Sequence, residues 1–221
     1  MSGALWAEIQ PQLGKILSKA QPVSMEEDVE DIGPDTLERV LRDLGDCQRC
    51  PLCEGRKNIV FGSGDPHADL LILGEAPGEH EDLEGVPFVG KAGEMLDRML
   101  SRVLKLRRDQ VYVVNVVKCR PPRNRDPHPE EREACSTFLR RQIFCVSPKM
   151  ILVLGGVAYR ALFGASEGIG RVRGQWKVWN NLPVMATYHP SFICRASGNQ
   201  ELEIKKIVQQ DLLEVLQRLT P

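Results

Sequence analysis

The chain has 221 residues, of which 42% are hydrophobic and 27% charged, and its net charge is −1 at neutral pH. This length suffices for one sizeable core with a short appendage, and no apolar stretch is long enough to cross a bilayer. The N-terminus lacks the basic and then apolar segments of a secretory signal, so we expect a cytoplasmic protein. In a reducing compartment, the seven cysteines favour a metal site over a disulfide framework.

The charge is unevenly distributed along the chain. Residues 24–46 carry nine acidic and two basic side chains and residues 1–23 a net +1, so the remaining residues 47–221 carry +5. Residues 1–20 predict a short helix that Pro11 weakens. We interpret residues 1–33 as an N-terminal extension with an acidic linker. Residues 34–221 are predicted to form the globular domain, whose basic character suits a polyanionic partner.

Apolar periodicity predicts alternating strands and helices along this domain. Helices are expected at residues 35–45, 91–104, 129–144, after Gly155-Gly156 through Phe163, and at 200–219, and strands at 70–73, 111–117, 151–154 and 184–187. The alternation predicts an α/β/α sandwich with a mainly parallel central sheet. Each strand is followed by a polar turn, and in such a sheet functional residues are expected where the strands end.

The cysteines are grouped as in many metal sites. Cys47 and Cys50 form a C-x-x-C pair, Cys119 ends a β-prone run, and Cys135 lies in the predicted helix that follows. Two close and two distant cysteines can hold either zinc or an iron–sulfur cluster, and spacing does not distinguish the two. Cys53 offers a second C-x-x-C pair with Cys50, so the choice of the ligand pair stays open.

Four blocks, CQRCPLCEGR, GEAPGEHEDLEGVPFVGKAG, VYVVNVVKCRPPRNRDP and YHPSF, resemble in this order the family 4 uracil-DNA glycosylases, from about Asp46 to about Arg195. The resemblance implies a uracil-DNA glycosylase-like fold. It also implies a monofunctional enzyme of base excision repair, which hydrolyses the N-glycosidic bond of deoxyuridine in DNA, releases uracil and leaves an abasic site. The implied cofactor is a [4Fe–4S] cluster, with the ligands Cys47, Cys50, Cys119 and Cys135. The family usually has an apolar residue where Cys53 stands.

The resemblance further implies a uracil pocket formed by Glu75, Ala76, Pro77, Phe88, Asn115 and His189. Phe88 can stack on a pyrimidine, and Asn115 can pair with uracil N3–H and O4. His189 can hydrogen-bond the O2 atom, which gains negative charge as the glycosidic bond breaks. The structural alternatives are core packing for Phe88 and a buried strand residue for Asn115.

A catalytic carboxylate is harder to assign. The turn after the first strand carries Ala76 where many other uracil glycosylases have a water-orienting Asp, so Glu75 and Glu81 are the candidates, and Asn124 is a possible helper. The structural alternative to a catalytic role is stabilising the turn for Glu75. For Glu81 it is that of an acidic residue at a helix N-terminus.

DNA contacts are expected from two segments. The basic loop contains Lys118, Arg120, Arg123, Asn124 and Arg125 and is expected to meet phosphates. The segment PSFICRAS resembles the family's loop that enters the minor groove, with Phe192, Ile193 and Arg195 as wedge and contact residues. The expected partner is uracil-containing DNA, single- or double-stranded, and the protein is expected to be a monomer.

Three other functions are compatible with the sequence. One is a related glycosylase that acts on hypoxanthine or mismatched thymine. The second is a non-catalytic DNA-binding module in which the cysteines hold zinc. The third is a glycosylase-like protein that traps DNA covalently. VKCRPPRNRDPHPEE lacks the basic insert of that subgroup, although His128 lies close by.

Overall fold

The computed structural model describes residues 35–219, and the helix and linker expected in residues 1–33 lie outside this range. Strands β1 (Ser63–Gly64), β2 (Leu70–Gly74), β3 (Tyr112–Asn115), β4 (Met150–Leu154), β5 (Trp176–Trp179) and β6 (Leu182–Thr187) form one sheet. The α-helices are α2 (Leu37–Leu44), α3 (Glu79–Glu84), α4 (Lys91–Met99), α5 (Pro129–Val146), α6 (Gly156–Phe163), α7 (Ile169–Val172), α8 (Pro190–Arg195) and α9 (Gly198–Leu219). None of the helices described is long and apolar enough to span a bilayer.

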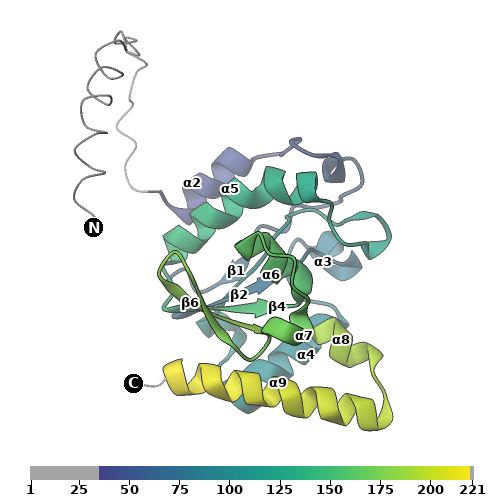
Figure 1. The fold of residues 1–221 in the computed structure, drawn as a ribbon. Coiled ribbons are helices and arrows are strands. Elements are labelled where there is room, and N and C mark those ends of the chain that lie inside the picture. Colours follow the sequence, from purple (N-terminus) through teal and green to yellow (C-terminus); the bar gives the residue numbers. More distant parts are fainter. Residues whose placement is uncertain (1–34, 220–221) are drawn as a thin grey trace, which may run out of the picture. The chain divides into compact units, whose positions relative to one another are not determined.

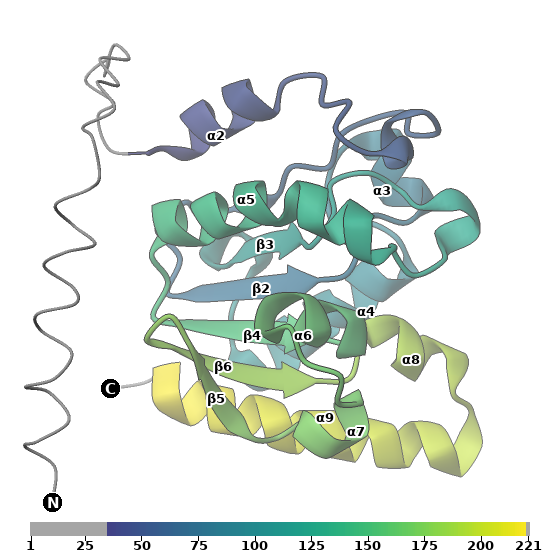
Figure 2. The same ribbon diagram turned by 45° about the horizontal axis from the view of Figure 1, so that its top comes forward.

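The sheet has the strand order β1-β3-β2-β4-β6-β5. Figure 1 labels β1, β2, β4 and β6, and Figure 2 also labels β3 and β5. The four central strands are parallel, whereas β1 and β5 run antiparallel at the two edges. In this register Gly74 lies beside Asn115, and Leu154 lies beside Thr187. The central strands therefore end at the same edge of the sheet, which brings together the polar turns that follow them.

Helices cover both faces of the sheet, so the predicted α/β/α sandwich is confirmed (Figure 2). The strand β2 is buried along its whole length, as a strand covered on both sides must be. Leu71 and Leu73 point to the face packed by α5 and α6, whereas Leu70 and Ile72 point to the face packed by α4 and α9. This alternation divides the apolar interior into two clusters, one on each side of the sheet.

Among these strands and α-helices, five were not anticipated by periodicity: β1, β5, α3, α7 and α8. Each has six residues or fewer, too short for an apolar repeat to be recognised. The segment expected as a DNA-contacting loop after His189 is instead the helix α8, which starts with Pro190 at a position where the missing N–H costs nothing. The helix expected at 91–104 changes at Leu100 from α-helical to a π-helical segment, η2 (Leu100–Leu104).

The helix α2 packs against α5 through a small apolar cluster of its own. Val40 and Leu44 of α2 contact Phe138 of α5. Arg141 of α5 also donates to Asp35 and Asp43, which flank and belong to α2. The cysteine-containing segment that follows α2 is thus brought beside α5, which carries Cys135.

Candidate active site

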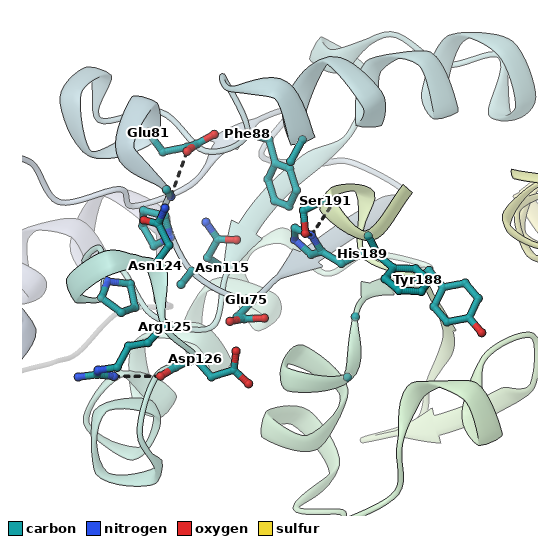
Figure 3. A pocket seen from close by; sticks show the side chains of 18 of the residues that line it. Glu75, Glu81, Phe88, Asn115, Asn124, Arg125, Asp126, Tyr188, His189 and Ser191 are labelled. Carbon is teal, nitrogen blue, oxygen red and sulfur yellow. Dashed lines mark hydrogen bonds between the residues drawn. The ribbon is translucent and has the colours of Figure 1, made fainter. Parts of the chain in front are cut away.

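The turns after β2, β3, β4 and β6 enclose a cavity of about 520 Å³ (Figure 3). Most of the residues predicted for the site line it: Glu75, Ala76, Pro77, Glu81, Phe88, Asn115, Asn124, His189, Phe192 and Arg195. Sequence analysis did not single out Asp126, Tyr188 and Ser191, which also line it. The sequence signal that could have identified them is their position, since each lies within or directly beside a recognised motif.

Asn115 lies at the end of β3 with 1% of its surface exposed, and its Oδ1 atom has no hydrogen-bond partner in the described chain. A buried amide oxygen without a partner is costly, by about 1–3 kcal/mol. Because the residue lines the cavity, a ligand N–H can supply the missing hydrogen bond. This observation favours a binding role for Asn115 over the structural alternative.

Phe88 lies across from Asn115 in a backbone conformation that bulky residues rarely adopt, with φ at 55°. Gly74 makes room for both side chains, since a Cβ atom there would lie 2.3 Å from Asn115 Oδ1 and 2.6 Å from the Phe88 ring. The strained backbone aims the aromatic ring at the cavity, and such strain persists only where the surroundings hold it.

His189 is oriented by the first turn of α8. Its Nδ1 accepts from the backbone N–H of Ser191 at 3.2 Å and lies 2.8 Å from Ser191 Oγ. Burial and, to a smaller extent, nearby Arg195 lower the pKa of His189 to about 4, while Glu81 opposes this shift. At neutral pH the ring is therefore uncharged, and with Nδ1 accepting, its proton lies on Nε2.

Close backbone approach fixes the position of this ring. Gly155, in the turn after β4, has φ at 91°, and a Cβ atom there would lie 3.0 Å from His189 Cβ. The ring centroid of His189 lies 5.7 Å from that of Phe88, with the planes tilted by 32°. The two rings therefore form adjoining walls of the cavity.

Two carboxyl groups meet at the opposite wall. Burial raises the pKa of Glu75 to about 7, and the charge and hydrogen bond of Asp126 contribute to this rise, while Arg160 and Arg132 oppose it. Asp126 is exposed, and its carboxylate lies 4.0 Å from the Arg160 guanidinium. A carboxyl group whose pKa lies near neutral pH is well suited to act as a general base.

The carboxylate of Glu81 accepts hydrogen bonds from backbone N–H groups. One oxygen accepts from the N–H groups of Val89 and Gly90, both at 2.9 Å, and the other accepts from the N–H of Gly78 at 3.0 Å. These bonds connect α3 to the segment that carries Phe88. They also occupy the Gly78 N–H, which is therefore not available as a donor to a leaving group.

The basic loop differs from the sequence-based expectation at two positions. Lys118 is buried, and Arg125 forms a bidentate pair with Glu131 at the start of α5, so neither presents a free charge to DNA. Arg120 and Arg123 do not line the cavity. Arg120 donates to Asn124 Oδ1 at 2.8 Å, and Arg123 is exposed at a positive φ of 56°.

The segment after His189 presents two of its three predicted contact residues. Phe192 is 37% exposed and its ring lies 5.0 Å from that of Tyr188, while Arg195 is exposed and donates to Ser191 Oγ. Ile193 is 1% exposed and packs into the core. Its interpretation as part of the DNA wedge is therefore wrong, because in a helix it points away from its neighbours Phe192 and Arg195.

The four predicted ligand cysteines come from three distant segments and lie close enough to affect one another's pKa. Burial raises the pKa of Cys119 to about 11, with Arg56 lowering it and the neighbouring Cys135 and Cys50 raising it. Burial likewise raises the pKa of Cys135, and the neighbouring Cys50 and Cys47 contribute to this rise, while Lys118 opposes it. Cys53 lies beside Cys50 in the same turn. No group of three or more His, Cys, Asp or Glu within residues 35–219 is placed to hold a single metal ion.

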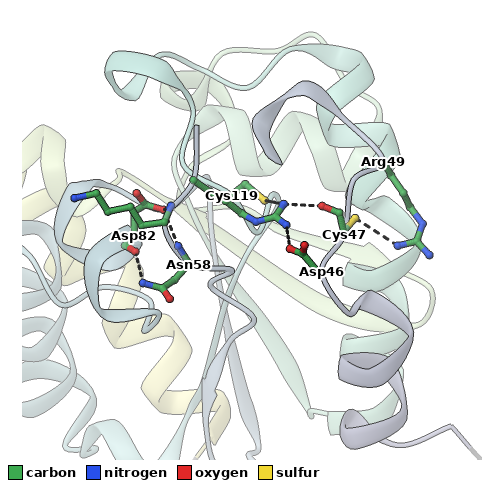
Figure 4. A network of polar contacts seen from close by, with 8 residues as sticks. Asp46, Cys47, Arg49, Asn58, Asp82 and Cys119 are labelled. Carbon is green, nitrogen blue, oxygen red and sulfur yellow. Dashed lines mark hydrogen bonds and ion pairs between the residues drawn. The ribbon is translucent and has the colours of Figure 1, made fainter. Parts of the chain in front are cut away.

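The surroundings of these sulfur atoms suit a negatively charged group. Arg49 donates to Cys47 Sγ at 3.4 Å, and Arg56 donates to Cys119 Sγ at 3.5 Å (Figure 4). Lys118 is 1% exposed beside Cys119 and Cys135, and no carboxylate of the described chain forms an ion pair with it. Hydrogen bonds to sulfur and a buried cation fit a thiolate-ligated cluster better than four neutral thiols.

Comparison with known proteins agrees with this geometry. The family model described as the Uracil DNA glycosylase superfamily matches residues 61–213. The "Type-4 uracil-DNA glycosylase" of Saccharolobus solfataricus is 41% identical, over 84% of this chain and 88% of its own. Proteins of the same description from Sulfurisphaera tokodaii (41%, over 82% and 84%) and Thermotoga maritima (43%, over 75% and 85%) are similarly close. The chain described here therefore belongs to the uracil-DNA glycosylase superfamily and to its type-4 branch.

Proposed function

We propose that the protein hydrolyses the N-glycosidic bond of deoxyuridine in DNA, releases uracil and leaves an abasic site. The observation that carries this proposal is the cavity in which the unpartnered Asn115 amide, the Phe88 ring and the neutral His189 ring converge. An enzyme that acts on a base must take it out of the helix and seat it in such a pocket. The type-4 membership of the chain supports the same reaction.

Uracil recognition is assigned to Asn115 and Phe88. The Oδ1 atom of Asn115, which lacks a partner in the described chain, accepts from uracil N3–H, and its amide NH₂ donates to O4. Phe88 stacks on the pyrimidine ring. Ala76 and Pro77 line the cavity as small apolar groups between the end of β2 and α3 and bound the space for the base.

Bond cleavage is assigned to His189 and Glu75. The Nε2–H of His189 donates to uracil O2, where negative charge develops, and a neutral donor suits a site that must exclude water. Glu75 orients or deprotonates the water that attacks the sugar, with Asp126 adjusting its protonation. Because both oxygens of Glu81 are bonded to the backbone, we assign Glu81 to positioning Phe88 rather than to the reacting water.

DNA binding is assigned to the exposed side chains around the cavity mouth. Phe192 fills the space left by the flipped base, and Arg195, Arg120 and Arg123 meet phosphates or bases, with Asn124 held by Arg120. The substrate is uracil-containing DNA, single- or double-stranded. A monomeric, cytoplasmic enzyme remains the expectation from the sequence.

Cys47, Cys50, Cys119 and Cys135 are assigned to a [4Fe–4S] cluster. When bound, such a cluster ties together the segment after α2, the end of β3 and α5, and base hydrolysis requires no electron from it. The arginine donors to Cys47 and Cys119 and the buried Lys118 support this assignment. Cys53 is left as a neighbouring, non-ligand thiol.

One experiment tests the proposal. The purified protein is incubated with single-stranded oligonucleotides that carry uracil, thymine or hypoxanthine, and abasic sites are revealed by alkaline cleavage. We expect release of uracil alone, no strand cleavage before alkali, and a brown protein that contains iron. A colourless zinc protein that binds DNA without excision would instead establish the non-catalytic module. DNA held covalently after denaturation would establish the trapping function.

A further inference from the structure

Lys118 is the largest fully buried side chain in the described chain, and it ends in a basic amine. Its Nζ atom donates to the main-chain carbonyl of Asn115 at 2.7 Å. Lys118 directly precedes Cys119 and lies beside Cys135, and its own carbonyl accepts from the Val60 N–H at 2.8 Å. One residue therefore touches both a predicted cluster ligand and the residue that reads the base.

A buried ammonium group needs compensation. Removing such a charge from water costs several kcal/mol unless an anion or several acceptors lie close by. Within residues 35–219, the Lys118 ammonium group has one acceptor, the carbonyl of Asn115, and no carboxylate pairs with it. The groups beside it that become negative when they ligate a cluster are the sulfur atoms of Cys119 and Cys135.

We propose that Lys118 is a positioning residue that couples the cluster to uracil recognition: its ammonium group neutralises the cluster's negative charge and holds the end of β3, and with it Asn115, in place. The proposal rests on the cluster assigned above. Since the Lys118 side chain spans from the cysteine side of the sheet to the carbonyl of Asn115, a change at either end is transmitted to the other. It touches neither substrate nor the reacting atoms.

The test compares Lys118→Met, which keeps the length and removes the charge, with Lys118→Arg, which keeps the charge in a different shape. Lys206→Met, on the exposed face of α9, is the matched control. Three properties are measured on cluster-loaded protein: the midpoint potential of the cluster, the rate at which a chelator bleaches its visible absorbance, and single-turnover excision with DNA affinity determined separately.

For Lys118→Met we expect a more negative midpoint potential, since removing a nearby cation disfavours the reduced cluster, and faster bleaching. Excision should fall by about 100-fold through the displaced Asn115, with DNA affinity within about twofold of the wild type, because Lys118 is buried. Lys118→Arg should keep a potential near that of the wild type yet lose excision. A Lys118→Met protein that matches Lys206→Met in potential and excision would overturn the proposal.

Two further outcomes are decisive. If Lys118→Met does not fold, a brown and folded Lys118→Arg protein with reduced excision supports the proposal. A colourless Lys118→Arg protein overturns it, because a positive charge at this position would then not suffice to keep the cluster. If the wild type itself contains no iron, the cluster assignment fails. That result is distinguishable from a failure of the Lys118 proposal, in which the wild type is brown and the variant is unaffected.

Discussion

We expect a single amide side chain, that of Asn115, to distinguish uracil from cytosine in this site. Uracil presents an acceptor at O4 and a donor at N3, whereas cytosine presents the reverse pattern at N4 and N3. Asn115 can read this difference only if its amide cannot turn over. Burial to 1% exposure and the close approach of Gly74 to Oδ1 restrict that rotation.

Asn115→Ala should therefore reduce uracil excision by about 1,000-fold or more, with iron content and DNA affinity nearly unchanged. Asn115→Asp should lose uracil excision as severely, because a carboxylate has only acceptors and repels O4, and should show at best faint excision of cytosine. Single-turnover assays on matched uracil and cytosine oligonucleotides measure both effects. Asn199→Ala, at an exposed position of α9, is the control. Near-normal uracil release by both Asn115 variants would make this a structural strand residue.

The protonation of Glu75 predicts how the rate depends on pH. If Glu75 must be ionised, single-turnover excision should rise with pH through about 7, the pKa of this group. His189, with a pKa of about 4, does not titrate in that range. Asp126→Asn removes a neighbouring negative charge, so the pKa of Glu75 should fall and the rise should occur at lower pH, while burial keeps the shift partial.

Folding stability offers an independent measure of the same group. The pKa of Glu75 is raised from 4.5 to about 7 in the folded protein. The contribution of Glu75 to the free energy of unfolding is therefore complete below pH 4.5 and is lost as pH rises through about 7. In Asp126→Asn this loss should be smaller and occur at lower pH. The exposed Asp109→Asn serves as the control. Coincident rate profiles for the wild type and Asp126→Asn would exclude the coupling.

At the scale of elements, α3 holds the segment that presents Phe88. Glu81→Gln replaces a carboxylate that accepts three backbone bonds with an amide whose NH₂ must face at least one backbone N–H. We expect a loss of about 3 kcal/mol in the free energy of unfolding and slower excision through a displaced Phe88. Denaturant unfolding and single-turnover assays measure the two effects. A Gln variant with the stability of the wild type that has lost excision would instead identify Glu81 as the base.

The elements also indicate what the sequence could predict. The long apolar strands β2, β4 and β6 and the amphipathic helices α5 and α9 were predicted to within a few residues, because burial on one or both faces leaves a clear pattern. The turns that form the site were predicted because parallel strands bring their following turns together, whereas the individual pocket residues followed from the resemblance to the family 4 enzymes. Asp126 was missed because its importance depends on the approach of Glu75 from another strand. Lys118 was misplaced because a basic side chain in a charged loop is usually exposed.

At the scale of the whole domain, the predicted cluster joins three segments that are far apart in sequence. Cys119→Ala should bleach the protein and lower its stability, since metal binding contributes directly to folding in such sites. Cys53→Ala should leave the colour unchanged. Visible absorbance, iron content and thermal unfolding of the two variants provide the comparison. A colourless Cys53→Ala protein beside a brown Cys47→Ala protein would reassign the ligand pair.

The N-terminal extension is expected to be dispensable for base excision. Residues 24–46 are strongly acidic, and an acidic segment does not help to bind a polyanion. A shortened chain that begins at Gly33 should therefore keep its iron, and its single-turnover rate should lie within about twofold of that of the full chain. Loss of excision in a shortened chain that still folds with iron would place the boundary of the domain further toward the N-terminus.

The two edge strands have a consequence for behaviour at high concentration. At one edge β1 has only two residues, and at the other β5 reads Trp-Lys-Val-Trp, with Lys177 exposed in its middle. An unpaired strand edge invites another chain to add to the sheet, and a short strand or a charged side chain discourages this. The buried parallel strands are thus shielded on both sides from intermolecular pairing. This arrangement should limit aggregation in a crowded cell, where a repair enzyme must search long stretches of DNA while remaining dispersed.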